Sequence, residues 1–258
     1  AGIYRDTVRL GDEAPIDKPL LNAEVTGQDS VLATLYKGEI FWVWGDTARL
    51  AFPLGNFSTS GARSQLPGKG GLDPSAGLNL RYFAGKDGFA KRLVPLDRPG
   101  LVWTDGLLAI NDNEGRERLF AHYVRMKDIM TLEETGYMLW NDEREEFEVA
   151  QQIPLDAPLM AGSHPIRVDV GGEEYFYFPG FYPYPEAYAH IRVKATWDAL
   201  FDLSQYEGYS CLKPGGRYDK ENPPFERDQQ GKLVWGWKRD TAPLTRRQMV
   251  ELLEAKKL

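Results

Sequence analysis

The chain has 258 residues, of which 42% are hydrophobic and 27% are charged, and its formal net charge is -7. This balance is typical of a globular protein, and the chain has no long block of Lys or Arg that would follow a phosphate backbone, which argues against nucleic acid as a partner. The single cysteine, Cys211, excludes an intramolecular disulfide and a thiolate metal site, and no stretch has the roughly 18 apolar residues of a membrane span.

Aromatic residues are concentrated in short strand-like runs, which is typical of β-rich proteins. One local pattern recurs four times along the chain: an apolar run, a turn that contains Gly, and a second run rich in aromatic residues. The first example is SVLATLYKGEIFWVWGDT, and further strand-like runs such as TGYMLWNDEREEFEVAQQ follow several of the hairpins. The four turns are expected at Lys37–Gly38, Asn111–Gly115, Gly171–Gly172 and Gln230–Gly231, with a further turn at Asn141–Arg144.

Units of about four antiparallel strands that repeat around an axis are the arrangement of a β-propeller. We therefore predict an all-β fold with one propeller domain over residues 1–258. Four blade-like units are visible, and the complete ring is expected to have five blades. The segment from Ala48 to Gly77 is too long and too rich in Gly, Ser and Pro for an ordinary connection, which indicates a functional insertion.

The end of the chain carries a helix signal. Thr245 and Gln248 form a capping-box pattern that predicts a short C-terminal helix. Because four blades leave a propeller ring open, we expect a C-terminal region beyond this sequence, or a second fragment, to close it. A compact four-bladed ring is the alternative.

Polar residues gather at the expected rim of the propeller. In a blade, the residues just before the first strand and just after the second meet around the central cavity. Asp29 precedes the first strand of the first hairpin and Asp46 follows the second, so one blade is expected to bring two carboxylates together. The positions that this reasoning places at the rim are Asp29, Asp46, Asp105, Arg125, His164 and Asp240.

The first hairpin carries a resemblance to a known group. The arrangement D-S-V-x6-G-x-I-F-W-V-W-G-D-T, from Asp29 to Thr47, resembles the first blade of the five-bladed β-propeller glycosidases, which include arabinanases, fructan-processing enzymes and the endo-D-arabinanase group. The resemblance implies a catalytic carboxylate at Asp29 and a second aspartate in the next blade, which matches Asp105. Those enzymes place a glutamate general acid in the third blade, where this sequence has His164, and Glu174 and Glu207 are poor substitutes.

These residues suit carbohydrate chemistry. Glycoside hydrolysis needs one protonated carboxyl group for the leaving oxygen and one carboxylate that activates water or attacks the anomeric carbon. Carboxylates on one rim push their pKa values apart, which supplies this division. We therefore predict a glycoside hydrolase acting on a poly- or oligosaccharide, with Asp29, Asp46, Asp105 and His164 as the catalytic set.

Two alternatives stay open. A polysaccharide lyase would use His164 and a tyrosine as base and acid, with arginines on the carboxylate of a uronate. A non-catalytic glycan-binding propeller would use the same rim, and Asp29 and Asp46 would then only accept hydrogen bonds from the backbone of their turns.

The expected substrate-binding residues lie on the rim and in two loops. Arginines in the long insertion would bind anionic groups through bidentate hydrogen bonds. The aromatic loop FPGFYPYPEAY, Phe178 to Tyr188, would stack against sugar rings. The full set is Arg49, Arg63, Arg125, Tyr182, Tyr184 and Asp240.

The remaining expectations concern cofactors, partners and location. The sequence has no closely spaced pair of metal ligands, so we expect no metal site and no cofactor, with an axial Ca²⁺ left open. The expected partner is an oligo- or polysaccharide, with neither nucleic acid nor membrane. The first residues, AGIYRD, lack the regions of a signal peptide, which fits a mature secreted protein or a cytosolic one. A polysaccharide substrate favours a secreted or periplasmic location.

Overall fold

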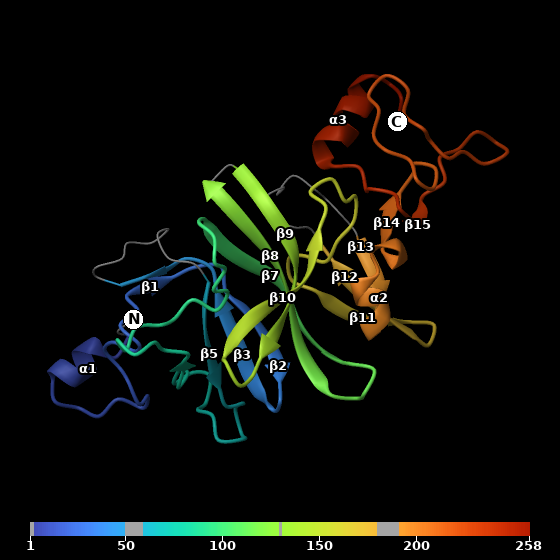
Figure 1. Ribbon diagram of the computed structural model, residues 1–258. Helices are drawn as coiled ribbons and strands as arrows, with labels where there is room; N and C mark the ends of the chain where they lie inside the picture. The colour runs from blue at the N-terminus through green and yellow to red at the C-terminus, as the bar shows by residue number, and fades with distance from the viewer. Residues whose placement is uncertain (1–2, 50–58, 129–130, 180–190) are drawn as a thin grey trace. The chain divides into compact units, whose positions relative to one another are not determined.

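The computed structural model describes residues 3–49, 59–128, 131–179 and 191–258, and its regular structure is mostly β (Figure 1). The described strands form four sheets, so the all-β prediction is confirmed. No sheet is closed on itself in the described residues, and the propeller stays a prediction. The chain divides into two compact units, residues 1–104 with 117–152 and residues 105–116 with 153–258.

A four-stranded sheet of the first unit is built on the first predicted hairpin. Its order is β2-β3-β5-β6, and the turn between β2 and β3 has positive φ at Lys37 (50°) and Gly38 (79°), as a two-residue hairpin requires. A separate two-stranded sheet pairs β1 with β4. The bounds are α1 Arg5–Arg9, β1 Gly27–Gln28, β2 Leu32–Tyr36, β3 Glu39–Trp44, β4 Thr47–Ala48, β5 Ser60–Ser64 and β6 Arg81–Tyr82.

The second four-stranded sheet has the order β10-β9-β8-β7. Side chains close two of its turns: the Asp112 carboxylate accepts hydrogen bonds from the backbone of Glu114 and Arg116, and the Asn141 amide oxygen accepts from Glu143 and Arg144. Both predicted turns are therefore present. The strands are β7 Leu101–Asn111, β8 Glu117–Asp128, β9 Thr131–Asn141 and β10 Glu146–Ile153.

The third large sheet is a meander of five strands in the order β11-β12-β13-β14-β15. Gly171 and Gly172 have positive φ (66° and 87°) and join β11 to β12 as predicted, and the capping box of α3 at Thr245 is also confirmed. The bounds are β11 Ile166–Val170, β12 Glu173–Phe178, β13 Ile191–Lys194, α2 Trp197–Phe201, the 3-10 helix η1 Leu203–Gln205, β14 Glu207–Ser210, β15 Gly236–Arg239 and α3 Arg246–Glu254.

The fourth predicted hairpin does not form a sheet of its own. Its second half is β15, which pairs with β14 and so completes the third sheet. The turn at Gln230–Gly231 is present, but Arg227 and Leu233 beside it form only an isolated bridge. The first half follows Pro223 and Pro224 and is rich in charge, which disfavours a regular strand. The assignment of a fourth blade to this hairpin is therefore wrong.

The core of the first unit is aromatic. Phe41 of β3 is fully buried, and its ring lies 5.4 Å from that of Phe83 and 4.8 Å from that of Trp140. The rings of Tyr36 and Phe147 complete the cluster, and each lies 6.2 Å from the ring of Phe41. Edge-to-face and tilted pairs of this kind add to the burial of apolar area.

The core of the second unit includes the inner face of β12 and β13. Phe176 and Phe178 alternate with half-buried tyrosines along β12, and Ile191 and Val193 are buried on the neighbouring strand. Tyr206 packs on Phe178 at 6.3 Å. One side of this sheet is thus packed, as its period-two pattern dictates.

Gly208 of β14 sits where no side chain fits. An added Cβ would lie 2.2 Å from the carbonyl oxygen of Thr241 and 2.9 Å from Cδ of Pro243. We expect Gly208→Ala to lower the free energy of unfolding by about 1–3 kcal/mol because the backbone must move. Gly236 on the adjacent strand has open space around its Cβ position, so Gly236→Ala is the matched control, within about 0.5 kcal/mol of wild type. Urea unfolding measures both, and equal stability of the two variants would contradict this packing.

Candidate functional site

The end of the first hairpin holds Asp29 and Asp46 together. The Asp29 backbone N–H donates to the Asp46 carbonyl (3.1 Å), and the Gly45 N–H donates to the Asp29 carbonyl (3.0 Å). The Asp46 N–H also donates to Oδ1 of Asp29 (3.2 Å). A Cβ at Gly45 would lie 3.1 Å from Cβ of Ser30 and 3.3 Å from Oδ1 of Asp29, so glycine permits this approach. The prediction that one hairpin delivers two neighbouring carboxylates therefore agrees with the geometry.

The surroundings of the Asp46 carboxyl group favour its protonated form more than water does. It is partly buried, and this burial raises the pKa of Asp46 above its ordinary value. Nε1 of Trp103 donates to Oδ1 of Asp46 (2.8 Å), which acts to lower the pKa, and the charge of Asp29 acts to raise it. The net direction is upward. A carboxyl group of raised pKa beside a second carboxylate is the arrangement that acid–base chemistry requires.

A buried polar network lies behind Asp46. The hydroxyl groups of Thr47 and Ser60 are 2.6 Å apart, and Nε2 of Gln28 donates to Oγ of Ser60 (3.0 Å). The hydroxyl group of Tyr82 donates to Oε1 of Gln28 (2.7 Å). Because each member has its partner, the network fixes the segment that follows Asp46.

Two tryptophans of β3 anchor the same region. Trp42 and Trp44 lie on one face of the strand, as their spacing predicts, with rings stacked at 6.2 Å and 14°. Tyr82 continues the stack at 5.5 Å from Trp44. The aromatic stack and the polar network thus meet at Tyr82.

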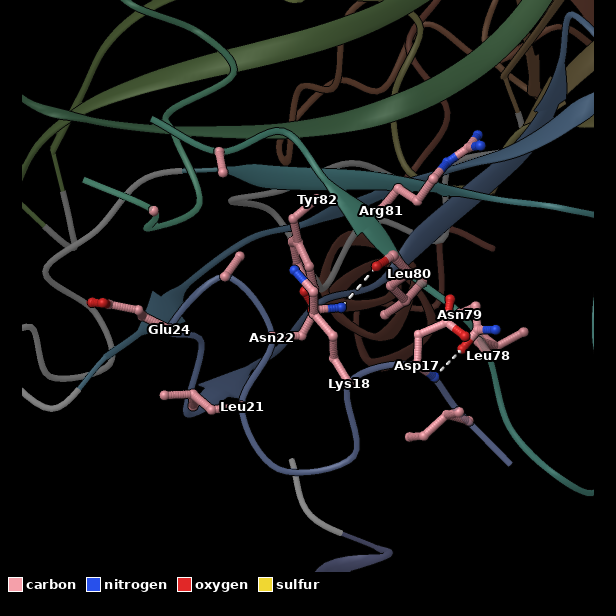
Figure 2. A pocket seen from close by; sticks show the side chains of 14 residues that line it. Asp17, Lys18, Leu21, Asn22, Glu24, Leu78, Asn79, Leu80, Arg81 and Tyr82 are labelled. Carbon is pink, nitrogen blue, oxygen red and sulfur yellow. Dashed lines mark hydrogen bonds between the residues drawn. The ribbon is translucent and has the colours of Figure 1, made fainter. Parts of the chain in front are cut away.

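Tyr82 also lines a pocket of about 570 Å³ in the first unit (Figure 2). Figure 2 shows the 16–24 segment facing the 78–82 segment, which leads into β6 and carries Leu80 and Tyr82. Nδ2 of Asn22 donates to the Leu80 carbonyl (2.7 Å), and the Asp17 N–H donates to Oδ1 of Asn79 (2.8 Å). These bonds fix the pocket's two walls. The predicted site residues are not among those that line it.

Two of the predicted substrate-binding arginines are bound to protein carboxylates. Arg49 lies 3.0 Å from Asp87, and its guanidinium stacks over the ring of Phe89 at 4.3 Å. Arg63 lies 3.0 Å from Asp142 and stacks over the aromatic core of the first unit. Arg63 pairs with Phe41 in the sheet register, three positions along β5 from Ser60, which places it away from the strand end near Asp46.

Arg125, the third predicted arginine, belongs to a charged cluster on β8 and β9. Its Nε donates to Oε2 of Glu134 (3.1 Å), and its Nη1 donates to the Pro99 carbonyl (3.0 Å). Glu134 also accepts hydrogen bonds from Arg98 (2.9 Å), Tyr123 (2.6 Å) and Gln152 (3.0 Å). Burial acts to raise the pKa of Glu134, but these hydrogen bonds outweigh it and hold the pKa below its ordinary value. The Glu134 carboxylate is therefore ionised.

Asp105 and His164 lie in the second unit. Asp105 was expected just before a strand, but β7 begins at Leu101, so Asp105 lies inside it. The prediction that Asp105 precedes the strand is therefore wrong, because the strand begins earlier and includes Val102 and Trp103. The Gly106 N–H donates to the Ser163 carbonyl (2.6 Å), which joins the neighbours of Asp105 and His164.

Asp240 occupies a tight turn in the second unit. Its φ is 50°, a left-handed conformation that aspartate tolerates, and its Oδ1 lies 2.6 Å from Nη2 of Arg217. Its position after β15 parallels that of Asp46 after β3, but its contacts are those of a turn residue paired with an arginine. Tyr182 and Tyr184 lie outside the described residues.

Sequence reasoning missed Trp103 and Glu134. Trp103 stands two positions before Asp105 and ahead of the predicted hairpin, which begins at Gly106, and nothing in the local sequence connects it with Asp46. Among the residues that the structure describes, no group of three His, Cys, Asp or Glu side chains could hold a metal ion. In the same part of the chain, none of the helices combines the length and the apolar character that crossing a membrane requires.

Comparison with known proteins gives likenesses to solved structures but to no family model. No family model matches the chain, and no curated protein matches it. The chain is similar to a crystal structure from Bacteroides ovatus ATCC 8483 described as a "putative hydrolase", with 18% identity and a TM-score of 0.47. The likeness covers 82% of this chain and 54% of that one, so the chain spans about half the length of that protein.

Proposed function

We propose that this chain is a carbohydrate-active hydrolase in which Asp46 acts as the general acid and Asp29 as the carboxylate that activates water. The observation that supports it is the pair itself: Asp46 has a raised pKa and lies against Asp29 in a rigid strand end. Protonated Asp46 would give its proton to the leaving glycosidic oxygen, while Asp29 would take a proton from the water that attacks the anomeric carbon. One water molecule is consumed for each bond broken.

The substrate class rests on the resemblance of the first hairpin to the propeller glycosidases and on the aromatic content of the chain. An oligo- or polysaccharide remains the proposed partner, and a secreted or periplasmic location follows from that substrate. Asp105 and His164 enter the proposal only through the resemblance. The lyase alternative gains no support, because Arg49, Arg63 and Arg125 are each paired with protein carboxylates.

The acid role can be tested through the pKa of Asp46. Trp103→Phe removes a hydrogen bond that lowers this pKa, so the pKa is expected to rise. Asp29→Asn removes a neighbouring negative charge that raises it, so the pKa is expected to fall. Carboxyl-carbon NMR titration of Asp46 measures both shifts, and the alkaline limb of the activity profile of Trp103→Phe should move to higher pH.

A matched control keeps this test specific. Nε1 of Trp42 donates to Oγ of Ser64 (2.8 Å), so Trp42→Phe also removes an indole hydrogen bond in the same sheet. Trp42→Phe should leave the pKa of Asp46 unchanged. Shifts of the same sign in Trp103→Phe and Asp29→Asn would sink the acid assignment.

A further inference from the structure

The outer face of the third large sheet is unusually aromatic. Strand register pairs Tyr177 with Arg192, Arg192 with Glu207, and Tyr209 with Trp237, so these side chains share one face. The opposite face carries the buried core of the second unit. We call the four rings on the outer face the aromatic shelf: Tyr177, Tyr209, Trp235 and Trp237.

The rings of the aromatic shelf form a continuous surface. Tyr209 and Trp235 stack at 5.9 Å with only 24° between their planes, and Tyr209 lies 5.3 Å from Trp237. Tyr177 extends the row at 5.3 Å from Trp237. Trp235 is 40% exposed and Tyr209 is 37% exposed, although both are large and apolar. Exposed aromatic rings grouped on one sheet face are typical of binding surfaces.

A charged pair is set into the aromatic shelf. The guanidinium of Arg192 lies 4.5 Å from the ring of Tyr175 and 4.5 Å from that of Trp237, so it is held between two rings. Its Nε donates to Oε2 of Glu207 (2.7 Å) and its Nη1 donates to the hydroxyl group of Tyr177 (3.3 Å). In the described part of the chain these bonds use Nε and Nη1 of Arg192 and Oε2 of Glu207. Among the described residues, none is hydrogen-bonded to Nη2 of Arg192 or to Oε1 of Glu207.

We propose that the aromatic shelf and the Arg192–Glu207 pair form a carbohydrate-binding platform separate from the Asp29–Asp46 pair. The C–H groups on one face of a sugar ring stack on Trp235 and Tyr209, and the hydroxyl groups at the edge of the ring bond to Arg192 and Glu207. An apolar protein surface would instead bury the ion pair without replacing its water contacts, which is unfavourable. The ligand chemistry that satisfies both the rings and the pair is a neutral sugar.

The other edge of the same face offers a different occupant and therefore a control. Three aliphatic side chains of β11 are exposed at this edge: Ile166, Val168 and Val170. A second protein sheet would use this edge as well as the rings, whereas a sugar would not need it. Val168→Thr therefore separates the two outcomes.

The test is binding of the full chain to defined probes. Cellohexaose, xylohexaose and arabinohexaose are titrated by isothermal calorimetry, with the polymers arabinan and xylan in affinity gels. Trp235→Ala and Tyr209→Ala are expected to weaken binding about ten-fold or more, and Trp235→Phe to retain most of it, because the ring face is kept. Val168→Thr should bind as wild type.

Each result decides the proposal. Failure of the wild-type chain to bind any of these probes overturns it, as does unchanged binding by Trp235→Ala. Concentration-dependent dimerisation that Val168→Thr abolishes, without sugar binding, would assign the face to a second copy instead. Asp46→Asn should bind sugar as wild type does, so loss of hydrolysis with intact binding tests the proposed function separately from the platform.

Discussion

Asp46→Asn is expected to lower the rate of glycoside hydrolysis by about 10²–10⁴-fold. The amide keeps the size of the side chain and can still accept the hydrogen bond from Nε1 of Trp103, but it cannot donate a proton to a leaving oxygen. Release of reducing ends from arabinan and xylan measures the loss. Absorbance near 235 nm in the same reactions would reveal elimination instead.

The matched control for this variant is Asp73→Asn. Asp73 lies in the same unit, and its Oδ1 accepts the backbone N–H of Ser75 (2.8 Å), a turn role that the amide oxygen can fulfil. Its activity should equal that of wild type. If Asp46→Asn keeps wild-type activity on a substrate that the chain does hydrolyse, the proton comes from another group and the acid assignment fails.

Glu134→Ala is expected to be the most destabilising of the variants considered, by about 3–5 kcal/mol. Its carboxylate joins two arginines, and the side chain of Arg125 is only 11% exposed. Removing the carboxylate leaves the hydroxyl group of Tyr123 without this acceptor, and it leaves the guanidinium of Arg125 with Glu133 and the Pro99 carbonyl alone among these contacts. Urea unfolding measures the change, with Glu133→Ala as control, because that carboxylate is 36% exposed and binds Arg125 from the outside.

The pH dependence of stability has a definite sign. The native pKa of Glu134 is lowered, so its contribution is present above the unfolded value of about 4.3 and is lost as the pH falls through the native pKa. In Glu134→Gln that acid-side loss should be reduced. If Glu133→Ala proved as destabilising as Glu134→Ala, the view of Glu134 as the centre of the cluster would be wrong.

Local sequence signals predicted local structure well. The glycine-containing turns at Lys37–Gly38 and Gly171–Gly172 marked hairpins because glycine adopts positive φ most readily. The capping box of α3 was readable from Thr245 and Gln248 alone. The approach of Asp46 to Asp29 followed in the same way, since both residues flank one hairpin. These features depend on contacts between residues close in the sequence.

Contacts between distant residues were not predictable in this way. Trp103 reaches Asp46 across 57 positions, and no pattern in either segment identifies the other. The Glu134 cluster was missed for another reason: no glycine marks the connection between β8 and β9, so the pairing of Arg125 with Glu134 had no turn signal. The assignment of β15 to a separate blade failed because the sequence of a strand does not determine which strand it pairs with, and β15 pairs with β14.

The joining of Asp29 to Asp46 through one hairpin has a consequence for how the carboxylate pair arises. The two residues are 17 positions apart, and the strands between them pair directly. Hairpins close on a timescale of about 1–10 μs, far ahead of long-range pairings. The pair can therefore assemble early in folding, and because it is encoded in one short contiguous segment, genetic exchange of that segment would transfer both carboxylates together. An insertion or deletion of one residue within either strand would instead move the side chains beyond it to the opposite face of the sheet, and this would separate the two carboxylates.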